Sequence, residues 1–387
     1  MARASLFPLP PEATRVILGG ESSIDMDSLN IMDHRSARGF ARNYGYDLNI
    51  PAQRAHVVQV YGNAMEFLGS AILEGQMEAI PLEIRELKDP EDLLVWASLR
   101  PQDQLSHWAC VVLRVMHTLF HIDHNVNLRH LKDIQTQVFE PYDRFLVALD
   151  DGTFILRGDY EVPLVAVERK QSKDRASMLL KMLHKPENVA ETIYDQIGIR
   201  FVAQDRLGVL LVIRFLLDHH VLMPTHIKPS RSRNLLVDMD ALQAWTAELP
   251  EGFVIPVVGS PEREAICARL VPKTRMDGGN PFMSRDYQAV QFTVRTLIRL
   301  PNPAVAVLEK ILKSLAPGDA TRVKIPQLIQ EQEEFTFFFA HEVQVMEPSG
   351  FQNTRSGPAS HGEYKQRQRD AARKRVLRGI KLEEAPC

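Results

Sequence analysis

Three polar side chains recur at a spacing of four residues: Lys173, Ser177 and Lys181. Residues four apart lie on one face of a helix, so both ammonium groups and the hydroxyl would point the same way. Such a row suits a polyphosphate, because it supplies positive charge and a hydrogen-bond donor along one line. Taken alone, however, the pattern is more typical of a solvated face of an amphipathic helix.

Two carboxylates fall in or beside segments that otherwise have the composition of buried strands. Asp195 precedes the aliphatic stretch 197–202, and Glu342 shares a strand face with Gln344, opposite the valines that alternate with them. A carboxylate entering an apolar environment needs a partner, and a metal ion is one such partner. The alternative for Asp195 is a capping residue at a turn between a helix and a strand. Two carboxylates on strands suit Mg²⁺ held against phosphates, so the pair predicts a magnesium site.

Three histidines share a helix face, because His117, His121 and His124 occupy positions i, i+4 and i+7. Imidazoles at helical spacing can bind a metal. We favour the alternative that this helix packs on a catalytic domain. No hydrolase activity is predicted.

The elements that would position these residues change in character near residue 140. Before it, the stretches 52–73 and 104–120 place apolar residues at steps of three and four, which predicts helices. We therefore expect a helical N-terminal region over residues 1–140, followed by a second domain over 141–387.

The second domain mixes strands and helices, which predicts an α/β or α+β fold with a mixed sheet. Asp150-Asp151-Gly152 separates two short apolar runs and predicts a hairpin. Further strands are expected at 164–167, 197–202, 287–300 and 335–346, and helices at 172–183, 207–217 and 304–315. The stretch 224–281 is expected to be irregular, with an insertion near 234–280. The basic segment 365–381 has helical spacing.

Composition excludes several classes of protein. The chain has 387 residues, 45% hydrophobic and 25% charged, with a net charge of −3, which excludes wholesale disorder and collagen-like repeats. Three scattered cysteines fit no disulfide framework and indicate a reducing compartment. No apolar run approaches the roughly 20 residues of a membrane span, and the N-terminus has no signal-like apolar segment. A cytoplasmic protein without membrane contact is expected.

Taken in order, the motifs resemble the synthetase domain of the RelA/SpoT family, which makes the alarmones ppGpp and pppGpp. The first half of the series is a basic Lys-x3-Ser-x3-Lys helix, an Asp-x-x-Gly/Ala-x-Arg strand and a Pro-containing loop that leads to a phosphate-contacting lysine. These are matched by Lys173, Ser177 and Lys181, then by Asp195, Gly198 and Arg200, and then by Pro224 and Lys228.

The second half of the series lies closer to the C-terminus. The family's Gly-Tyr-Gln-Ser-Leu-His strand, its Glu-Ile-Gln-Ile-Arg-Thr strand and its Ala-Ala-His-Trp-x-Tyr-Lys segment follow one another. They are matched by Tyr287 and Gln288, by Glu342 to Val345, and by Ala359, His361, Tyr364 and Lys365. The resemblance extends over roughly residues 165–365.

The resemblance implies a nucleotidyltransferase-like synthetase domain over 141–387 that acts as an ATP-dependent pyrophosphokinase. It would transfer the β,γ-pyrophosphate of ATP to the 3′-hydroxyl of GTP or GDP and release AMP. It implies Mg²⁺ held by Asp195 and Glu342, with Tyr287 stacked on the acceptor base. The phosphate-binding residues that it implies are Lys173, Ser177, Lys181, Arg200 and Lys228, and the further candidates are Gln344, His361, Tyr364 and Lys365.

Because the chain departs from the family pattern at several positions, the resemblance does not identify the molecule that accepts the pyrophosphate. Gln171 stands where the family has an arginine that packs on the ATP base, and Ala289 and Gln291 replace a serine and a histidine. The alternatives are pyrophosphate transfer to the 3′ end of tRNA and a catalytically inactive protein that senses nucleotides. The eight Lys and Arg residues between 365 and 381 would line the nucleotide site, contact RNA or form a solvated helix face. A homo-oligomer is a further expectation from the resemblance.

Overall fold

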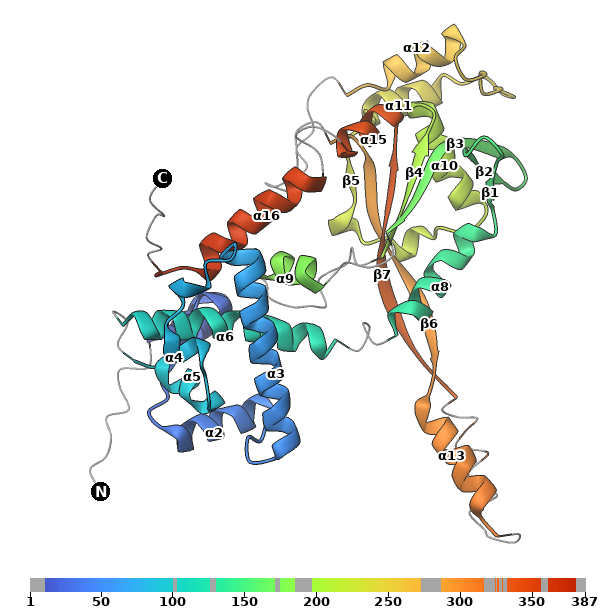
Figure 1. Ribbon diagram of the computed structural model, residues 1–387. Helices are drawn as coiled ribbons and strands as arrows, with labels where there is room; N and C mark the ends of the chain where they lie inside the picture. Colours follow the sequence, from blue (N-terminus) through green and yellow to red (C-terminus); the bar gives the residue numbers. More distant parts are fainter. Residues whose placement is uncertain are drawn as a thin grey trace. The chain divides into compact units, whose positions relative to one another are not determined.

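The computed structural model describes residues 11–99, 103–125, 130–170, 175–184, 197–272, 287–316, 333–355 and 361–380, with residues 324, 326 and 329 (Figure 1). The chain forms two compact units. The first unit comprises Met1–Leu128, Lys173–Ile193 and His361–Cys387, and the second comprises Arg129–Ser172 and Tyr194–Ser360. The units therefore do not follow a linear division at residue 140, because two segments that come after it in the sequence belong with the N-terminal helices.

The first unit is helical. Its helices are α1 (Pro11–Gly19), α2 (His34–Tyr44), α3 (Pro51–Phe67), α4 (Leu82–Arg85), α5 (Pro90–Trp96), α6 (Gln104–Asp123), α9 (Arg175–His184) and α16 (His361–Val376). The predicted helices at 52–73 and 104–120 are confirmed as α3 and α6. Pro51 occupies the first turn of α3, where a missing N–H costs least, and the Asp103 carboxylate accepts a bond from the Leu105 N–H at the start of α6.

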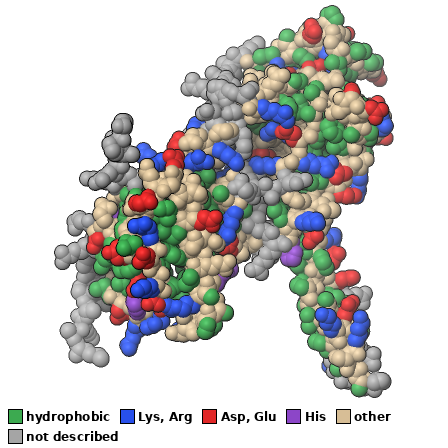
Figure 2. Space-filling view, in the orientation of Figure 1, with side chains coloured by type: hydrophobic (Ala, Val, Ile, Leu, Met, Phe, Trp, Pro, Cys, Tyr) green, Lys and Arg blue, Asp and Glu red, His purple; other side chains and the backbone are tan. Residues whose placement is uncertain are grey.

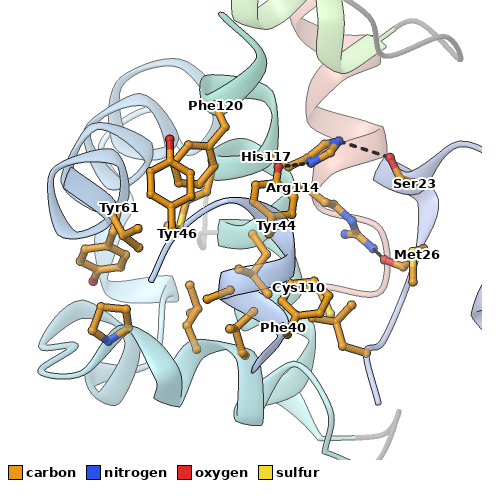
Figure 3. Close-up of a pocket in the computed structure, with 18 of the residues that line it drawn as sticks. Ser23, Met26, Phe40, Tyr44, Tyr46, Tyr61, Cys110, Arg114, His117 and Phe120 are labelled. Atoms are coloured by element: carbon orange, nitrogen blue, oxygen red, sulfur yellow. Dashed lines mark hydrogen bonds between the residues drawn. The ribbon is translucent and has the colours of Figure 1, made fainter. Parts of the chain in front are cut away.

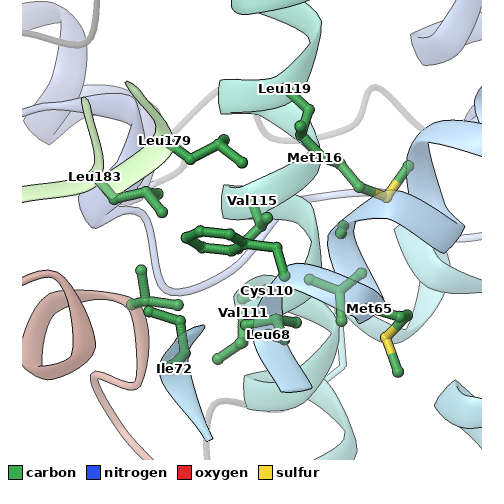
Figure 4. Packing of buried hydrophobic residues seen from close by; sticks show 14 of the residues in the cluster. Met65, Leu68, Ile72, Cys110, Val111, Val115, Met116, Leu119, Leu179 and Leu183 are labelled. Carbon is green, nitrogen blue, oxygen red and sulfur yellow. The ribbon is translucent and has the colours of Figure 1, made fainter. Parts of the chain in front are cut away.

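Helix α9 belongs to this unit because most of its residues are buried in the helical core. Its residues Met178 to Leu183 are all buried. Leu179 and Leu183 lie against Val111 and Val115 of α6, as Figure 4 shows. Burial of the five Leu and Met side chains of α9 contributes roughly 1.5–3 kcal/mol each relative to exposure, so α9 is a core element of the first unit.

The second unit is built on one sheet of seven strands in the order β1-β2-β3-β4-β7-β6-β5. The strands are β1 (Leu146–Ala148), β2 (Phe154–Arg157), β3 (Glu161–Lys170), β4 (Gly198–Ala203), β5 (Arg233–Asn234), β6 (Val290–Pro301) and β7 (Glu334–Met346). Strands β4 and β7 are parallel, and the other neighbours are antiparallel. The expected mixed α/β class is thus confirmed.

One face of this sheet is covered by helices. The helices of the unit are α8 (Leu131–Asp143), α10 (Arg206–Asp218), α11 (Met239–Ala247), α12 (Pro261–Arg269), α13 (Pro303–Ser314) and α15 (Pro348–Arg355). His341, Val343 and Val345 of β7 are buried on the face that α8 and α10 cover. Because side chains alternate along a strand, Glu342 and Gln344 lie on the opposite face.

The stretch 224–281 is not irregular over its described part, and that expectation is wrong. It contains β5, α11 and α12. The Asp238 carboxylate caps α11 by accepting from the Ala241 N–H at 3.0 Å, and the Ser260 hydroxyl caps α12, whose first residue is proline. These capping residues are helix-start signals that the density of proline and charge in the segment obscures.

Helix α13 has no buried residue, and Val307 and Ile311 are 56% and 43% exposed. Figure 2 shows hydrophobic and charged side chains side by side along it. None of the described helices has both the length and the apolarity to cross a membrane.

Candidate functional site

Four polar side chains lie in one row across four adjacent strands of the second unit. Glu168 of β3 is in register with Arg200 of β4, Arg200 with Gln344 of β7, and Gln344 with Gln291 of β6. Directly opposed residues on neighbouring strands point to the same face and lie about 4.5–5.5 Å apart at Cβ. The row therefore crosses the sheet on the face opposite α8 and α10.

Glu342 lies beside this row, and its carboxylate is held by two amides. The Gln291 side chain donates to Oε1, and Gln344 Nε2 donates to Oε2 at 2.8 Å. Hydrogen bonds to a carboxylate are charge-assisted and about twice as strong as neutral ones. The two amides thus fix the orientation of Glu342.

Arg200 extends the network toward β3. Its Nε donates to Gln344 Oε1 at 2.9 Å, and its Nη1 donates to Glu168 Oε2 at 2.8 Å. Arg355 of α15 donates to the other oxygen of Glu168 at 2.6 Å, and its guanidinium lies 4.4 Å from the centre of the Phe351 ring. Glu168 therefore offsets the charge of two arginines.

Tyr287 joins the network at its other end. Its hydroxyl donates to Gln291 Oε1 at 3.2 Å, and the residue is half-buried. Because Gln291 accepts from Tyr287 with its oxygen, its amide nitrogen faces Glu342. Side chains from β3, β4, β6, β7, α15 and the segment before β6 thus form one continuous polar network.

The backbone around Glu342 is closely packed. The Glu342 N–H donates to the Ile197 carbonyl at 3.0 Å, and a Cβ on Gly198 would lie 3.0 Å from the Glu342 carbonyl oxygen. A side chain at position 198 would therefore push β4 and β7 apart. Lys228 lies one strand further on, since its N–H donates to the carbonyl of Thr293, the register partner of Glu342.

The residues behind the network are neutral. His341 is fully buried, and burial lowers its pKa to about 3. Its Nε2 lies 2.9 Å from the Tyr142 hydroxyl, and burial raises the pKa of Tyr142. These two buried residues thus add no charge behind the polar face.

Glu342 offers carboxylate oxygens, the ligand type that Mg²⁺ prefers. Gln291 and Gln344 turn amide nitrogens toward it, and amide nitrogens do not ligate Mg²⁺. Within the described ranges, no three His, Cys, Asp or Glu side chains gather as a metal site would need. The donor chemistry of Glu342 therefore fits Mg²⁺.

The structure brings together the predicted residues Arg200, Tyr287, Glu342 and Gln344, with Lys228 on the neighbouring segment. Ser177, Lys181 and Lys365 belong to the first unit. Lys173 and Asp195 lie outside the described residues, and so do the side chains of His361 and Tyr364.

Lys181 is only 8% exposed. It is flanked in α9 by buried leucine and methionine residues. The alternative of a solvated lysine on an amphipathic helix is therefore wrong for this residue.

Sequence patterns do not indicate four further residues of the network, which are Glu168, Gln291, Phe351 and Arg355. Gln291 is visible only as a departure from the family pattern, and Glu168 lies in a basic stretch where a carboxylate looks like a surface residue. Neither residue has a motif, because their roles come from the register between paired strands and not from neighbouring residues in the sequence.

Two of the three histidines of α6 form hydrogen bonds to tyrosines of the first unit. His117 Nδ1 lies 2.7 Å from the Tyr44 hydroxyl, and His124 Nε2 lies 2.8 Å from the Tyr46 hydroxyl. These tyrosines belong to α2 and the residues just after it, within the first unit.

Part of the basic segment 365–381 forms ion pairs within the first unit. Arg375 donates to both oxygens of Asp25, at 2.7 and 2.6 Å, and Arg373 lies 3.6 Å from Glu74. Arg375 is therefore a structural residue of this unit.

No family model matches the chain, and no curated protein matches it. Among the solved structures, the chain matches the small alarmone synthetase 1 from Bacillus subtilis, with a TM-score of 0.24 and 12% identity. That match covers 55% of this chain and 73% of the other.

Proposed function

We propose that the chain is a pyrophosphokinase of the alarmone-synthetase type, which transfers the β,γ-pyrophosphate of ATP to the 3′-hydroxyl of GTP or GDP. One observation supports this proposal above the others. Residues from three separate sequence motifs, Arg200, Tyr287 and Glu342, belong to one hydrogen-bonded network, although Arg200 and its partner Gln344 are 144 residues apart in the chain.

In this proposal the network places opposite charges where the reaction needs them. The 3′-oxygen attacks the β-phosphorus, the bond between that phosphorus and the α,β-bridging oxygen breaks, and AMP leaves with the electron pair. The Arg200 guanidinium would stabilise the transferring pyrophosphate. Glu342, or a water that it holds, would take the proton of the 3′-hydroxyl.

The remaining predicted residues take roles around this centre. Tyr287 would stack on the guanine, with Gln291 fixing the tilt of its ring. Lys228 would contact phosphates. Glu342 and Asp195 would hold Mg²⁺, which when bound neutralises phosphate charge. The cytoplasm, where ATP and GTP are abundant, is the compartment that fits this reaction.

The test is a transfer assay with ATP labelled in its β- or γ-phosphate, Mg²⁺, and GTP, GDP or bulk tRNA as acceptor. Glu342→Gln keeps the shape of the side chain and removes its charge, so we expect at least about a hundredfold loss of turnover. Glu334→Gln is the matched control, because Glu334 lies on the same strand and is half-exposed. It should retain wild-type turnover.

Each result of this assay has one meaning. Labelled guanosine tetra- or pentaphosphate that disappears only in Glu342→Gln supports the proposal. Label on tRNA would instead assign the alternative acceptor. Nucleotide binding without transfer to any acceptor would assign a nucleotide-sensing protein and would reject the enzyme.

A further inference from the structure

The first unit contains a cavity that the proposed reaction does not use. It has a volume of about 240 Å³ and is lined from α2, α3, α5, α6 and the turn before α2. An engineered apolar cavity of about 150 Å³ already stays dry and binds benzene. This cavity is therefore large enough for a small organic molecule.

Its lining is mostly hydrophobic and rich in aromatic rings. Phe40, Tyr44, Tyr46, Tyr61 and Phe120 contribute rings, and the remaining lining is largely aliphatic (Figure 3). Ligand sites combine such apolar walls with a few well-placed polar groups. The walls thus favour a ligand with an apolar, ring-sized body.

Among the described residues of the lining, Arg114 is the only one with a charged side chain. Its guanidinium donates to the carbonyls of Met26 and Val376, at 2.9 and 2.8 Å, and to the Asp27 carboxylate at 3.1 Å. The charge of Arg114 is thereby offset within the protein. Because this charge already has the Asp27 carboxylate as its counter-ion, a ligand without net charge is favoured.

One corner of the cavity is polar. The His117 ring lies between two hydroxyls, with Nδ1 at 2.7 Å from Tyr44 and Nε2 at 3.3 Å from Ser23, and Figure 3 shows both hydroxyls turned toward it. Burial lowers the pKa of His117 to about 4, so the ring is neutral at pH 7.

A neutral imidazole has one N–H donor and one acceptor nitrogen. In either tautomer, one hydroxyl donates to the ring and the other accepts from it. The hydroxyl that accepts keeps its own proton. The corner can therefore donate one hydrogen bond to a ligand whichever nitrogen carries the proton.

We infer that this cavity, here called the aromatic pocket, binds a neutral, mainly apolar small molecule that carries one hydrogen-bond acceptor such as a carbonyl. The Ser23–His117–Tyr44 corner donates to that acceptor, and the aromatic and aliphatic walls enclose the rest. The inference does not depend on the proposed enzymatic function, because every lining residue belongs to the first unit.

The test uses the full chain and the probe prodan, a neutral naphthalene that bears one ketone and emits at shorter wavelength in apolar surroundings. We expect saturable binding with a blue-shifted emission. Val57→Phe fills the pocket from α3 and should weaken binding at least tenfold. Val58→Phe is the matched control on the next residue, which is 45% exposed and does not line the pocket, and it should bind as the wild type does.

The polar corner has a separate test, which also serves if Val57→Phe fails to fold. The double variant Ser23→Ala, Tyr44→Phe removes both hydroxyls and should weaken prodan binding about three- to tenfold, the value of one hydrogen bond. Its affinity for 2-ethylnaphthalene, measured by displacement of prodan, should stay unchanged because that molecule has no acceptor.

Three results would overturn the inference. The first is the absence of saturable prodan binding to the wild type. The second is wild-type affinity in a Val57→Phe protein that keeps its melting temperature. The third is an equal loss in both valine variants, which would mean that the probe binds the surface of α3.

Discussion

Gln344 connects the two charged groups of the candidate site, since its oxygen accepts from Arg200 and its nitrogen donates to Glu342. An uncharged amide can do both at once, because it carries an acceptor oxygen and a donor nitrogen in one plane. Replacement of Gln344 by leucine would remove its hydrogen bonds to Arg200 and Glu342 without opening a large cavity.

We expect Gln344→Leu to lower kcat by about ten- to a hundredfold, the usual effect of removing a positioning partner of a functional side chain. The melting temperature should change by only a few degrees, because the residue is half-buried. Steady-state kinetics with ATP varied would measure this. Wild-type kcat in a folded Gln344→Leu protein would contradict a positioning role for the amide.

His341 links pH to stability on the other face of the same strand. Its pKa is about 3 in the folded chain and about 6.5 when unfolded. Above pH 6.5 neither state is protonated. Below it only the unfolded state gains a proton, so the free energy of unfolding falls by roughly 1.4 kcal/mol per pH unit until the folded-state pKa is reached.

His341→Gln keeps a hydrogen-bonding partner for Tyr142 and does not titrate. Between pH 7.5 and pH 5, we expect the variant to lose about 2 kcal/mol less stability than the wild type. Urea unfolding of the second unit, followed by hydrogen exchange in β4 and β7, would measure the difference. Parallel pH profiles for the two proteins would show that the histidine is charged when buried.

Helix α10 has an aspartate near each end, and the two differ in burial. Asp205 caps the helix through the Gly208 N–H at 2.8 Å and pairs with Arg263 of α12, whose side chain is 6% exposed. Asp218 pairs with Arg214, whose side chain is 72% exposed. Asp205 therefore contributes to the stability of the second unit, whereas Asp218 contributes little.

We expect Asp205→Ala to lower the free energy of unfolding of the second unit by about 3–5 kcal/mol, because it leaves Arg263 buried without its carboxylate. Asp218→Ala should cost much less, because its partner Arg214 is exposed to solvent. Denaturant unfolding of both variants would measure the two losses in the free energy of unfolding. Equal losses would mean that solvent reaches Arg263 in the folded state.

Most elements of the fold are predictable from sequence because their signals are local. Alternation predicts β6 and β7, Asp150-Asp151-Gly152 predicts the β1–β2 hairpin, and apolar periodicity predicts α3, α6 and α10. Helices α11 and α12 are missed, although Asp238 and Ser260 mark their starts. Regular apolar periodicity therefore predicts helices and strands well, whereas capping residues are hard to recognise in a segment rich in proline and charge.

The candidate site is only partly predictable, for a different reason. Arg200, Tyr287 and Glu342 follow from motifs. Glu168 and Arg355 enter through strand register and through the packing of α15, and neither is encoded in neighbouring residues. Non-local pairing, such as the parallel alignment of β4 with β7, leaves no periodic trace in the sequence.

At the scale of the whole chain, the first unit is assembled from three separate segments. Arg375 of α16 connects these segments, because it donates hydrogen bonds to the Asp25 carboxylate and, at 3.1 Å, to the Leu183 carbonyl of α9. Its side chain is 14% exposed, whereas that of Arg373 is 33% exposed.

We expect Arg375→Ala to destabilise the first unit by about 2–3 kcal/mol, because it leaves a partly buried carboxylate and a carbonyl without their donor. Arg373→Ala should cost under about 1 kcal/mol. Hydrogen exchange should accelerate in α6 and α9 of Arg375→Ala and stay unchanged in β4 and β7. Faster exchange in β7 would mean that the two units unfold together.

This three-part assembly has a consequence for synthesis on the ribosome. Ala372 and Val376 of α16 are fully buried in the core of the first unit, yet they are made more than two hundred residues after α6. At about 5–20 residues per second, the N-terminal helices would wait on the order of ten to fifty seconds for their last core segment. The second unit, complete once residue 360 has emerged, can fold first. During that interval the nascent helices expose apolar surface, and a chaperone that holds them would favour the yield of native protein.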